Sequence, residues 1–337
     1  GQHAGACHRI NGAARADDEC VPAGENTGDT ANHHDHAGPA AAPGPRIRIG
    51  LWPHPDPAGS VLLLPGRSEY IEKYGHTAKD LHARGYATLA IDWRGQGMAD
   101  RLLDDHRIGH VNKFTDFQRD LRAVTDAATA LDLPHPWHIV GHSMGGAIAL
   151  RAVMEWIDVK SCVFTGPMFG IRISTVLRPV GWALAYAAPV LGLGQMLPPT
   201  TTIDNYVQTN PYEGNVLTTD PDMYRLMQDQ LTAMPDIALG GPSLVWLREA
   251  LTESLHLSRR PSPNLPCATF LGAKEKIIET HRVHDRMAAW PSGELHVVEG
   301  AEHEVLMETP DIRNMIFDKM ITLFETAETR AGMAQTA

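Results

Sequence analysis

Short apolar runs alternate with stretches of helical periodicity along the chain from residue 46 onward. Short apolar runs bounded by Gly or Pro are typical of buried strands, and apolar residues recurring every three or four positions are typical of helices. The pattern predicts strands over residues 46–52, 61–64, 87–91, 138–140, 163–165, 268–271 and 295–298. It predicts helices over residues 70–84, 115–131, 147–156, 281–290 and 311–326.

This alternation predicts βαβ units, and therefore an α/β fold with a mostly parallel sheet and helices on both of its faces. The alternation stops between residues 167 and 261, where Gly and Pro interrupt the apolar runs, and then resumes. We therefore expect a core formed by residues 46–166 and 262–327, with residues 167–261 inserted into it. Ligands of such sheets bind beyond the carboxyl ends of the strands, so the chemistry is expected there.

The two ends of the chain lack these patterns. Residues 1–45 are rich in Ala, Gly, His and Asp and hold almost no large apolar side chains. Such a segment cannot bury enough surface to offset its ordering entropy, so we expect a disordered tail, and likewise over residues 328–337. The N-terminal tail has no basic stretch followed by an apolar one, as a secretory signal would have, and we expect a cytoplasmic protein.

Composition and charge narrow the functions that the chain can have. Hydrophobic residues make up 43% and charged residues 20%, which is ordinary for a globular enzyme. The net charge of −11 argues against nucleic acid as a partner, because its phosphates would repel the protein. No CxxC pair occurs and no metal or organic cofactor is expected; the cysteines are Cys7, Cys20, Cys162 and Cys267.

The segment Gly141-His142-Ser143-Met144-Gly145 has the form Gly-x-Ser-x-Gly and lies between a predicted buried strand and a predicted helix. At such a strand–turn–helix corner the serine takes a strained and exposed position, and the glycines avoid collisions that a Cβ would cause. Pattern and context together predict an α/β-hydrolase fold with Ser143 as the nucleophile. The alternative is a serine that caps the helix, followed by glycines that pack closely.

A serine hydroxyl needs a base to become an effective nucleophile, and His303 is the best placed of the 18 histidines. In this fold the base lies on a loop after the last strand. Residues 299–304 form such a loop directly after the predicted strand at 295–298. The alternative is an ordinary loop histidine with no catalytic role.

The acid that orients the base should follow the preceding strand. Glu275 lies a few residues past the strand at 268–271, where its carboxylate can hold the imidazole tautomer and stabilise the imidazolium. Glu279 lies within one helical turn of it and is the main rival. A surface salt bridge of Glu275 with Lys274 or Lys276 is the alternative.

The tetrahedral intermediate of acyl transfer needs N–H donors aimed at its oxyanion. The backbone N–H of Met144 follows the nucleophile directly, and the backbone N–H of Arg67 lies in the loop after the strand at 61–64, where Gly66 allows a close approach. We expect these two groups to form the oxyanion hole. The Arg67 side chain could meet a phosphate or a carboxylate, but an exposed loop charge is the simpler interpretation.

Six segments in order are more specific than the pentapeptide alone: residues 65–74 (PGRSEYIEKY), 92–97 (DWRGQG), 109–111 (GHV), 141–146 (GHSMGG), 166–170 (GPMFG) and 300–304 (GAEHE). Together they resemble the bacterial lysophospholipase and monoacylglycerol lipase group of α/β hydrolases. The resemblance implies lipid-ester hydrolysis by a serine, an acid and a histidine in that order. Asp is usual in the family where this chain has Glu275, and the N-terminal tail matches nothing in it.

Residues 167–261 resemble, by their position, the cap that covers the active site in this family. The apolar stretch at 180–193 is too short and too interrupted by Gly and Pro to span a membrane. A helix whose apolar face guides an acyl chain is one interpretation, and a helix that only packs on the core is the other. The predicted walls of an acyl pocket are Trp182, Tyr186, Met196, Trp246 and Leu247.

The predicted function is hydrolysis of a lipid-like ester, a lysophospholipid or a monoacylglycerol, through an acyl-enzyme on Ser143 with His303 as the base. The expected partner is this small-molecule ester, with transient contact between the cap and the inner membrane surface. A short-chain esterase, an amidase or aminopeptidase, an acyltransferase and a non-catalytic binding module are the alternatives, because a fold does not decide a function.

Overall fold

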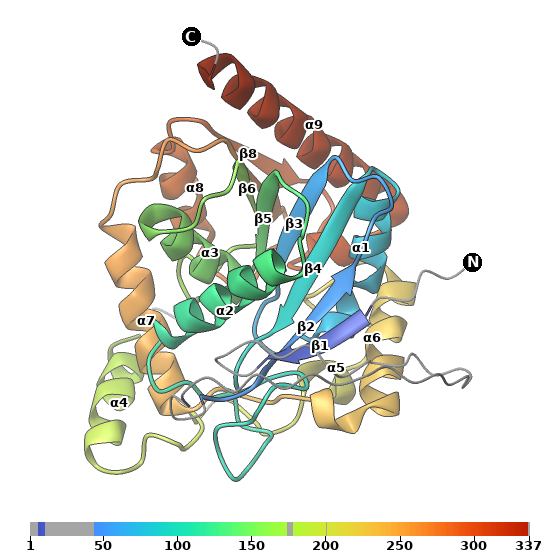
Figure 1. Cartoon of the computed structure of the whole chain (residues 1–337). Helices are drawn as coiled ribbons and strands as arrows, with labels where there is room; N and C mark the ends of the chain where they lie inside the picture. Colours follow the sequence, from blue (N-terminus) through green and yellow to red (C-terminus); the bar gives the residue numbers. More distant parts are fainter. Residues whose placement is uncertain (1–5, 11–43, 174–177, 200, 336–337) are drawn as a thin grey trace, which may run out of the picture.

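A computed structural model of the chain describes residues 6–10, 44–173, 178–199 and 201–335 (Figure 1). Within these ranges the chain forms one sheet of eight strands, in the spatial order β1-β2-β4-β3-β5-β6-β7-β8. Strands β3 to β8 run parallel, while β2 pairs antiparallel with β1 and with β4. The strands are Ala6–Ile10 (β1), Ile47–Trp52 (β2), Gly59–Leu64 (β3), Tyr86–Asp92 (β4), Trp137–His142 (β5), Ser161–Thr165 (β6), Cys267–Gly272 (β7) and Gly293–Val298 (β8).

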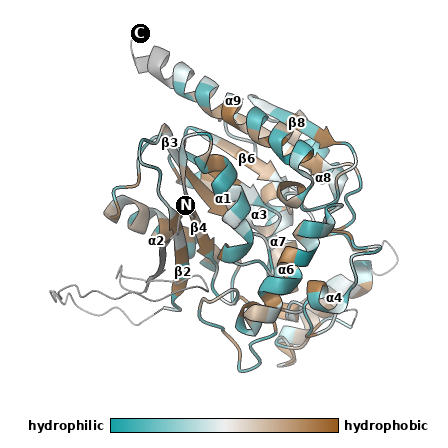
Figure 2. Cartoon of the chain, turned by 90° about the vertical axis from the view of Figure 1, so that its right-hand side faces the viewer, coloured by the Kyte–Doolittle hydropathy of each residue, from teal (hydrophilic) through white to brown (hydrophobic). Residues whose placement is uncertain are grey.

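The central strands are buried on both sides, which explains their continuous apolar runs. In β3, Leu62 and Leu64 join one hydrophobic core, and Val61 and Leu63 join the other, because successive side chains point to opposite faces. The first core lies under α2 (Asp116–Ala130), α3 (Met144–Glu155) and α8 (Thr280–Ala288), and the second under α1 (Gly75–His82) and α9 (Pro310–Gln335). Figure 2 shows the inner strands mostly in brown between helices of mixed colour, whereas the edge strand β8 is partly teal. The predicted α/β-hydrolase architecture is confirmed.

Between β6 and β7 the chain forms a block of helices that we call the insertion (residues 167–261). Helix α7 packs on the core below it through Trp246, Ala250 and Leu257. Helix α4 packs against α7 and lies at the periphery of the molecule in both views (Figures 1 and 2). The insertion contains α4 (Arg178–Val190), α5 (Tyr206–Thr209), α6 (Pro221–Ala233), the short 3-10 helix η2 (Pro235–Ile237) and α7 (Leu244–Ser258).

The prediction of a disordered N-terminal tail is wrong for Ala6–Ile10, which form β1 and pair antiparallel with β2. For residues 1–5 and 11–43 the prediction lies outside the described residues. An edge strand presents unpaired N–H and C=O groups, and a short segment can pair with them without much apolar surface of its own. The prediction of a disordered C-terminus is also wrong, because α9 continues to Gln335. The residues after 327 include Ala, Glu and Met, which have high helix propensity. They therefore extend α9, which is already anchored on the core.

The helix predicted over residues 70–84 forms in two parts. A 3-10 helix η1 (Ile71–Tyr74) comes first, and α1 begins at Gly75. Ile71 and Tyr74 are buried and several polar side chains of this segment are fixed by tertiary contacts, so packing overrides the helical periodicity. A second short 3-10 helix, η3 (Val305–Met307), precedes α9.

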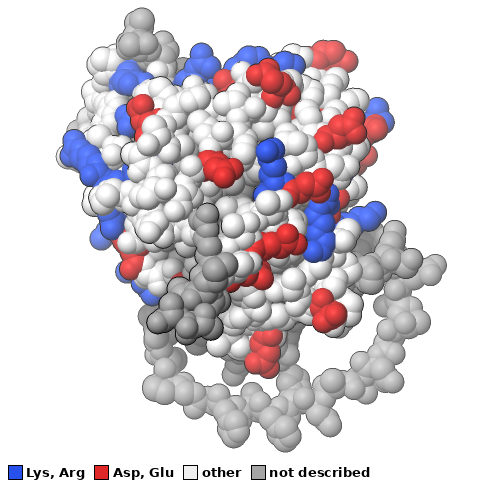
Figure 3. Space-filling view, turned by 90° about the horizontal axis from the view of Figure 1, so that it is seen from above, with Lys and Arg blue, Asp and Glu red and all other residues white. Residues whose placement is uncertain are grey.

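No helix in the described part of the chain combines the length and apolar character that a membrane crossing needs. Lys and Arg side chains are interspersed with Asp and Glu over the face shown in Figure 3. This face therefore offers no broad basic surface of the kind that phosphate backbones attract.

Candidate active site

Ser143 sits at the sharp turn between β5 and α3, with φ 49° and ψ −115°. Its backbone N–H donates to the Thr165 carbonyl at 3.0 Å, which ties the turn to β6. A Cβ on Gly145 would collide with the Leu64 and Pro65 carbonyls, and a Cβ on Gly141 would lie 2.8 Å from the Gly145 oxygen. A strained serine between two glycines that cannot carry side chains is the geometry of a nucleophile elbow rather than of an ordinary cap.

His303 lies on the loop after β8, with its ring 4.8 Å from the ring of His142, the neighbour of Ser143 (centre to centre). Its Nδ1 lies 2.5 Å from Glu275 Oε2, and both side chains are buried. The carboxylate thus fixes one nitrogen of the ring and leaves Nε2 for another partner. His303 and Ser143 line the same cavity.

Glu275 follows β7, and its second oxygen accepts hydrogen bonds from the backbone N–H of Ile277 (2.6 Å) and Ile278 (3.3 Å). Burial alone would raise the pKa of the carboxyl, but the hydrogen bond and charge of His303, together with these N–H groups, outweigh it and lower the pKa below its usual value. A carboxylate held ionised beside an imidazole is suited to stabilise an imidazolium.

The rival acid, Glu279, has other partners. Its carboxylate pairs with Arg178 at the start of α4 and with Arg282 in α8. Lys276, one of the two lysines weighed as a partner for Glu275, lies instead 3.8 Å from Glu302. The structure therefore brings Glu275, and not Glu279, to His303.

The two backbone donors predicted for the oxyanion hole belong to segments that adjoin Ser143. The N–H of Met144, at the start of α3, and the N–H of Arg67, in the loop after β3, donate to no protein acceptor among the described residues. That loop approaches the elbow closely, since a Cβ on Gly66 would lie 3.0 Å from the Ser143 Cβ. The two groups are thus free to bind an oxyanion formed at Ser143.

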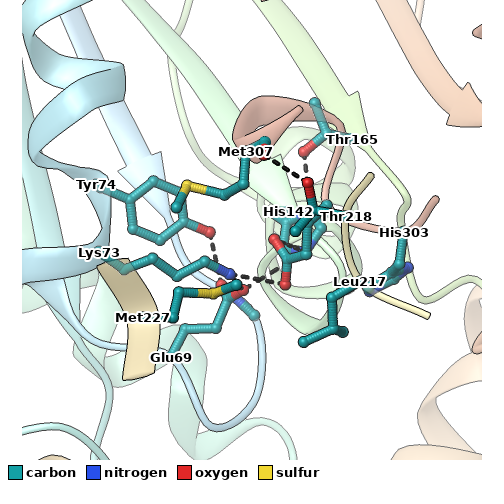
Figure 4. Close-up of polar contacts among 12 residues, drawn as sticks. Glu69, Lys73, Tyr74, His142, Thr165, Leu217, Thr218, Met227, His303 and Met307 are labelled. Atoms are coloured by element: carbon teal, nitrogen blue, oxygen red, sulfur yellow. Dashed lines mark hydrogen bonds and ion pairs between the residues drawn. The ribbon is translucent and has the colours of Figure 1, made fainter. Parts of the chain in front are cut away.

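A buried polar cluster lies directly behind this loop (Figure 4). The Glu69 carboxylate accepts hydrogen bonds from the Gly66 N–H, from Lys73 Nζ and, at 2.6 Å, from the Tyr74 hydroxyl. Lys73 Nζ also pairs with Glu304 at 2.7 Å, and Glu304 is the neighbour of His303. The cluster therefore connects the oxyanion loop with the loop that carries the predicted base.

His142 completes this cluster. Its Nδ1 lies 3.0 Å from Thr165 Oγ1, and its Nε2 lies 3.2 Å from Glu304 and 3.6 Å from Glu69. Burial would lower the pKa of His142, but the charges of Glu304 and Glu69 raise it above its usual value. Burial would likewise raise the pKa of Glu304, yet His142 and Lys73 hold it well below the usual range. The fixed charges thus support one another inside the fold.

Glu69, His142 and Glu304 bring potential metal-ligand atoms within 4.8 Å of one another. The Lys73 ammonium is bonded to both carboxylates, so a cation of the protein already occupies the space between them. The donor set therefore fits an internal ion cluster better than a metal site.

A cavity of about 770 Å³ opens in front of Ser143 and His303. It lies beyond the carboxyl ends of the strands, where parallel sheets usually bind their ligands. The insertion covers its opposite side. Most of the exposed lining is apolar. The insertion contributes apolar walls that include Val180, Leu184, Val207, Leu231, Trp246 and Leu247.

Trp246 and Leu247 line this cavity, but the prediction does not hold for Trp182, Tyr186 and Met196. The rings of Trp182 and Tyr186 stack on each other at 5.6 Å, and the Tyr186 hydroxyl meets Thr252 of α7 at 2.8 Å. Met196 is 55% exposed. Because α4 turns this face toward α7, Val180 and Leu184 reach the cavity instead.

Sequence analysis does not single out Glu69, Lys73 and Glu304. One signal was present, since Glu69 and Lys73 are four residues apart and flank the buried Tyr70 and Ile71. Charged residues within an apolar segment behind an oxyanion loop indicate an internal ion pair, but Glu304 comes from a distant loop and only the fold brings it there.

A family model described as "Serine aminopeptidase, S33" matches residues 55–310. The chain belongs to this family. The match begins before β3 and ends at the start of α9, and it therefore includes the elbow, both loops that follow β7 and β8, and the whole insertion.

Two curated relatives of this S33 hydrolase are informative. Lysophospholipase L2 of Escherichia coli strain K12 is 31% identical over 82% of this chain and 83% of its own length. Monoacylglycerol lipase of Mycolicibacterium smegmatis is 30% identical over 48% of this chain and 56% of its own length. The resemblance to the lysophospholipase and monoacylglycerol lipase group is confirmed.

Among solved structures, a soluble variant of monoglyceride lipase from Saccharomyces cerevisiae, in complex with a substrate analogue, superposes with a TM-score of 0.65. The match covers 84% of this chain and 93% of the lipase at 20% sequence identity. At this identity the likeness establishes the fold alone.

Proposed function

We propose that the protein hydrolyses the acyl ester of a lysophospholipid or a monoacylglycerol through an acyl-enzyme on Ser143. One observation carries the proposal: Ser143 at a strained elbow and the His303–Glu275 pair face one apolar cavity. The relatives named lysophospholipase L2 and monoacylglycerol lipase support the choice of substrate class.

The reaction proceeds in two halves. His303 Nε2 accepts the proton of the Ser143 hydroxyl while Oγ attacks the ester carbonyl, and the imidazolium then donates that proton to the departing glycerol oxygen. Water next attacks the acyl-enzyme while His303 accepts its proton, and the imidazolium then returns this proton to Ser143 Oγ as the bond to the acyl group breaks and the fatty acid leaves. Glu275 holds the ring in the required tautomer throughout and stabilises its charged form.

The negative oxygen of each tetrahedral intermediate lies between the N–H groups of Arg67 and Met144. Both groups lack protein acceptors among the described residues, so neither has to break a hydrogen bond to bind the oxyanion. Donors that are already oriented need no rearrangement as charge develops, which is the main advantage of such a site.

The apolar walls favour an acyl chain over a small acid. Each methylene that leaves water for an apolar wall contributes about 0.8 kcal/mol, which corresponds to about fourfold in kcat/KM. A cavity of about 770 Å³ can accommodate a long chain together with part of the glycerol.

Helix α4 and the turn after it form an apolar surface suited to a membrane. Val190 is 84% exposed and Leu191 71%, and these values are high for large apolar residues. We infer that this surface contacts lipid when substrate is taken up. Co-sedimentation with vesicles of neutral phospholipid tests this inference, with Val190→Ser/Leu191→Ser expected to reduce the bound fraction and leave the turnover of a water-soluble ester intact.

The proposed activity is tested by a series of esters with acyl chains from acetyl to palmitoyl, together with an aminopeptidase substrate. The proposal expects kcat/KM to rise with chain length until the cavity is filled, and little release of an amine from the peptide. Turnover of acetyl esters alone, or preferential cleavage of the peptide, would overturn it.

A further inference from the structure

The side chain of Arg67 is a cation that has no acidic partner among the described residues. Its Nη1 donates to the Gly240 carbonyl at 2.7 Å, and its Cζ lies 5.6 Å from the centre of the Trp246 ring. In the part of the chain that the structure describes, no Asp or Glu forms an ion pair with it. The sequence favoured an exposed loop charge; instead the guanidinium packs between the oxyanion loop and the insertion.

Within the described ranges, most donors of this guanidinium have no protein acceptor. A guanidinium has five N–H groups, and Gly240 is the acceptor found among the described residues. The other nitrogens of the guanidinium group remain accessible from outside the protein. Arg67 also lines the cavity. Burial lowers the pKa of Arg67 to about 10, so the group is still charged at neutral pH.

The other cations along the cavity differ from Arg67. Lys73 is neutralised by Glu69 and Glu304. Arg172 is exposed to solvent, where its charge is screened. A charge that is withdrawn from water without a counter-ion costs free energy, and a ligand of opposite charge recovers it. Arg67 is therefore the cation on this wall that is best placed to hold an anion.

We propose that the Arg67 guanidinium binds the phosphate of a lysophospholipid substrate and makes the enzyme select it over a neutral monoacylglycerol. The inference rests on the proposed function and names the substrate within it. The two spans have a comparable maximum length, because the same number of covalent bonds separates the ester carbonyl carbon from phosphorus in a lysophospholipid as separates the Arg67 backbone nitrogen from Cζ. One residue can thus face the oxyanion with its N–H and the phosphate with its planar, bidentate side chain.

The test compares two substrates with the same acyl chain in the same mixed micelles: palmitoyl lysophosphatidylethanolamine and monopalmitoylglycerol. The readout is the ratio of kcat/KM for the first to kcat/KM for the second. We expect Arg67→Gln to lower this ratio about tenfold or more, since a charge-assisted bidentate contact is lost, and Arg67→Lys to restore part of it. The matched control is Arg172→Gln, which should leave the ratio as in the wild type.

A second measurement separates the headgroup from free phosphate. Glycerophosphate should inhibit the wild type competitively and the Arg67→Gln variant much more weakly, whereas inorganic phosphate alone should inhibit both weakly. Equal losses on both substrates in Arg67→Gln would overturn the inference and leave Arg67 with a structural role, and so would a fall of the ratio in Arg172→Gln instead. If the wild type hydrolyses neither substrate, the proposed function fails as well.

Discussion

The carboxylate of Glu275 lies 2.5 Å from Nδ1 of His303, with both side chains almost completely withdrawn from solvent. Because the pKa of Glu275 is held below its usual value, the proton between them belongs to the imidazole, and Nε2 of His303 is left as the acceptor. In the proposed reaction this one contact sets the tautomer of the base and makes Glu275 the acid.

Replacing Glu275 by Gln should lower kcat by about 10²- to 10⁴-fold, because an amide can present an N–H to Nδ1 and stabilise the wrong tautomer. Glu279→Gln is the matched control, since Glu279 pairs with Arg178 and Arg282, and it should change kcat by less than about threefold. The measurement is single-substrate turnover of a long-chain ester by both variants. A larger loss in Glu279→Gln than in Glu275→Gln would reverse the assignment.

Glu69 should matter for catalysis although it touches no substrate atom in the proposed reaction. Its carboxylate accepts from the Gly66 N–H, and Gln cannot serve Gly66, Lys73 and Tyr74 together. We expect Glu69→Gln to lower kcat by about tenfold or more with KM nearly unchanged, because the N–H of Arg67 loses its orientation.

Glu72→Gln is the control for this prediction. Glu72 lies in the same segment but pairs with Arg48, away from the cavity. Thermal unfolding of both variants shows how far each change affects stability. If Glu72→Gln lowers kcat as much as Glu69→Gln does, the effect is general loosening of the segment and not the oxyanion loop.

His138 should make the fold sensitive to acid. It is fully buried in β5, next to Ser161 Oγ (2.8 Å) and Glu328 (3.2 Å), and burial lowers its pKa from 6.5 to about 3. On acidification the His138 side chain is therefore protonated in the unfolded chain but not in the folded one. The free energy of unfolding decreases as the pH drops below the pKa of His138 in the unfolded chain. From about pH 7.5 to about pH 5.5 this loss amounts to about 1.4 kcal/mol.

Urea unfolding of the wild type and of His138→Gln at both pH values checks this prediction. The other titrating groups contribute to both proteins and cancel in the difference. The stability of the wild type relative to the variant should decrease by the stated amount on acidification. A difference that is independent of pH, or one that grows in favour of the wild type, would contradict it.

The parts of the fold and site that follow from local pattern could be predicted from the sequence. Ser143 and Glu275 each follow a buried strand that its own apolar run identifies, and His303 follows the half-exposed edge strand β8; the carboxyl ends of these parallel strands meet at one edge. Neither the strand at Ala6–Ile10 nor the extension of α9 to Gln335 has such a pattern, since each depends on an edge or a surface provided by the rest of the fold.

The walls of the cavity could be predicted only in part. Trp246 lies on α7, whose apolar face packs on the core, whereas the orientation of α4 is set by its contacts with α7. Periodicity does not indicate which side of a largely apolar helix faces the cavity. The sequence therefore predicts Trp182 as a wall of the acyl pocket, whereas Leu184 lines the cavity in the structure. The polar cluster and the Arg67 side chain depend on contacts between segments far apart in the sequence.

Covalent labelling of the nucleophile is the most direct test of whether Ser143 carries the acyl group in the acyl-enzyme. The wild type and Ser143→Ala are incubated with a fluorophosphonate probe, digested and analysed by mass spectrometry, with thermal unfolding as the check that both are folded. We expect one labelled peptide, modified at Ser143, and the loss of both label and long-chain ester turnover in Ser143→Ala. Labelling at another serine, or turnover by Ser143→Ala at the wild-type rate, would contradict it.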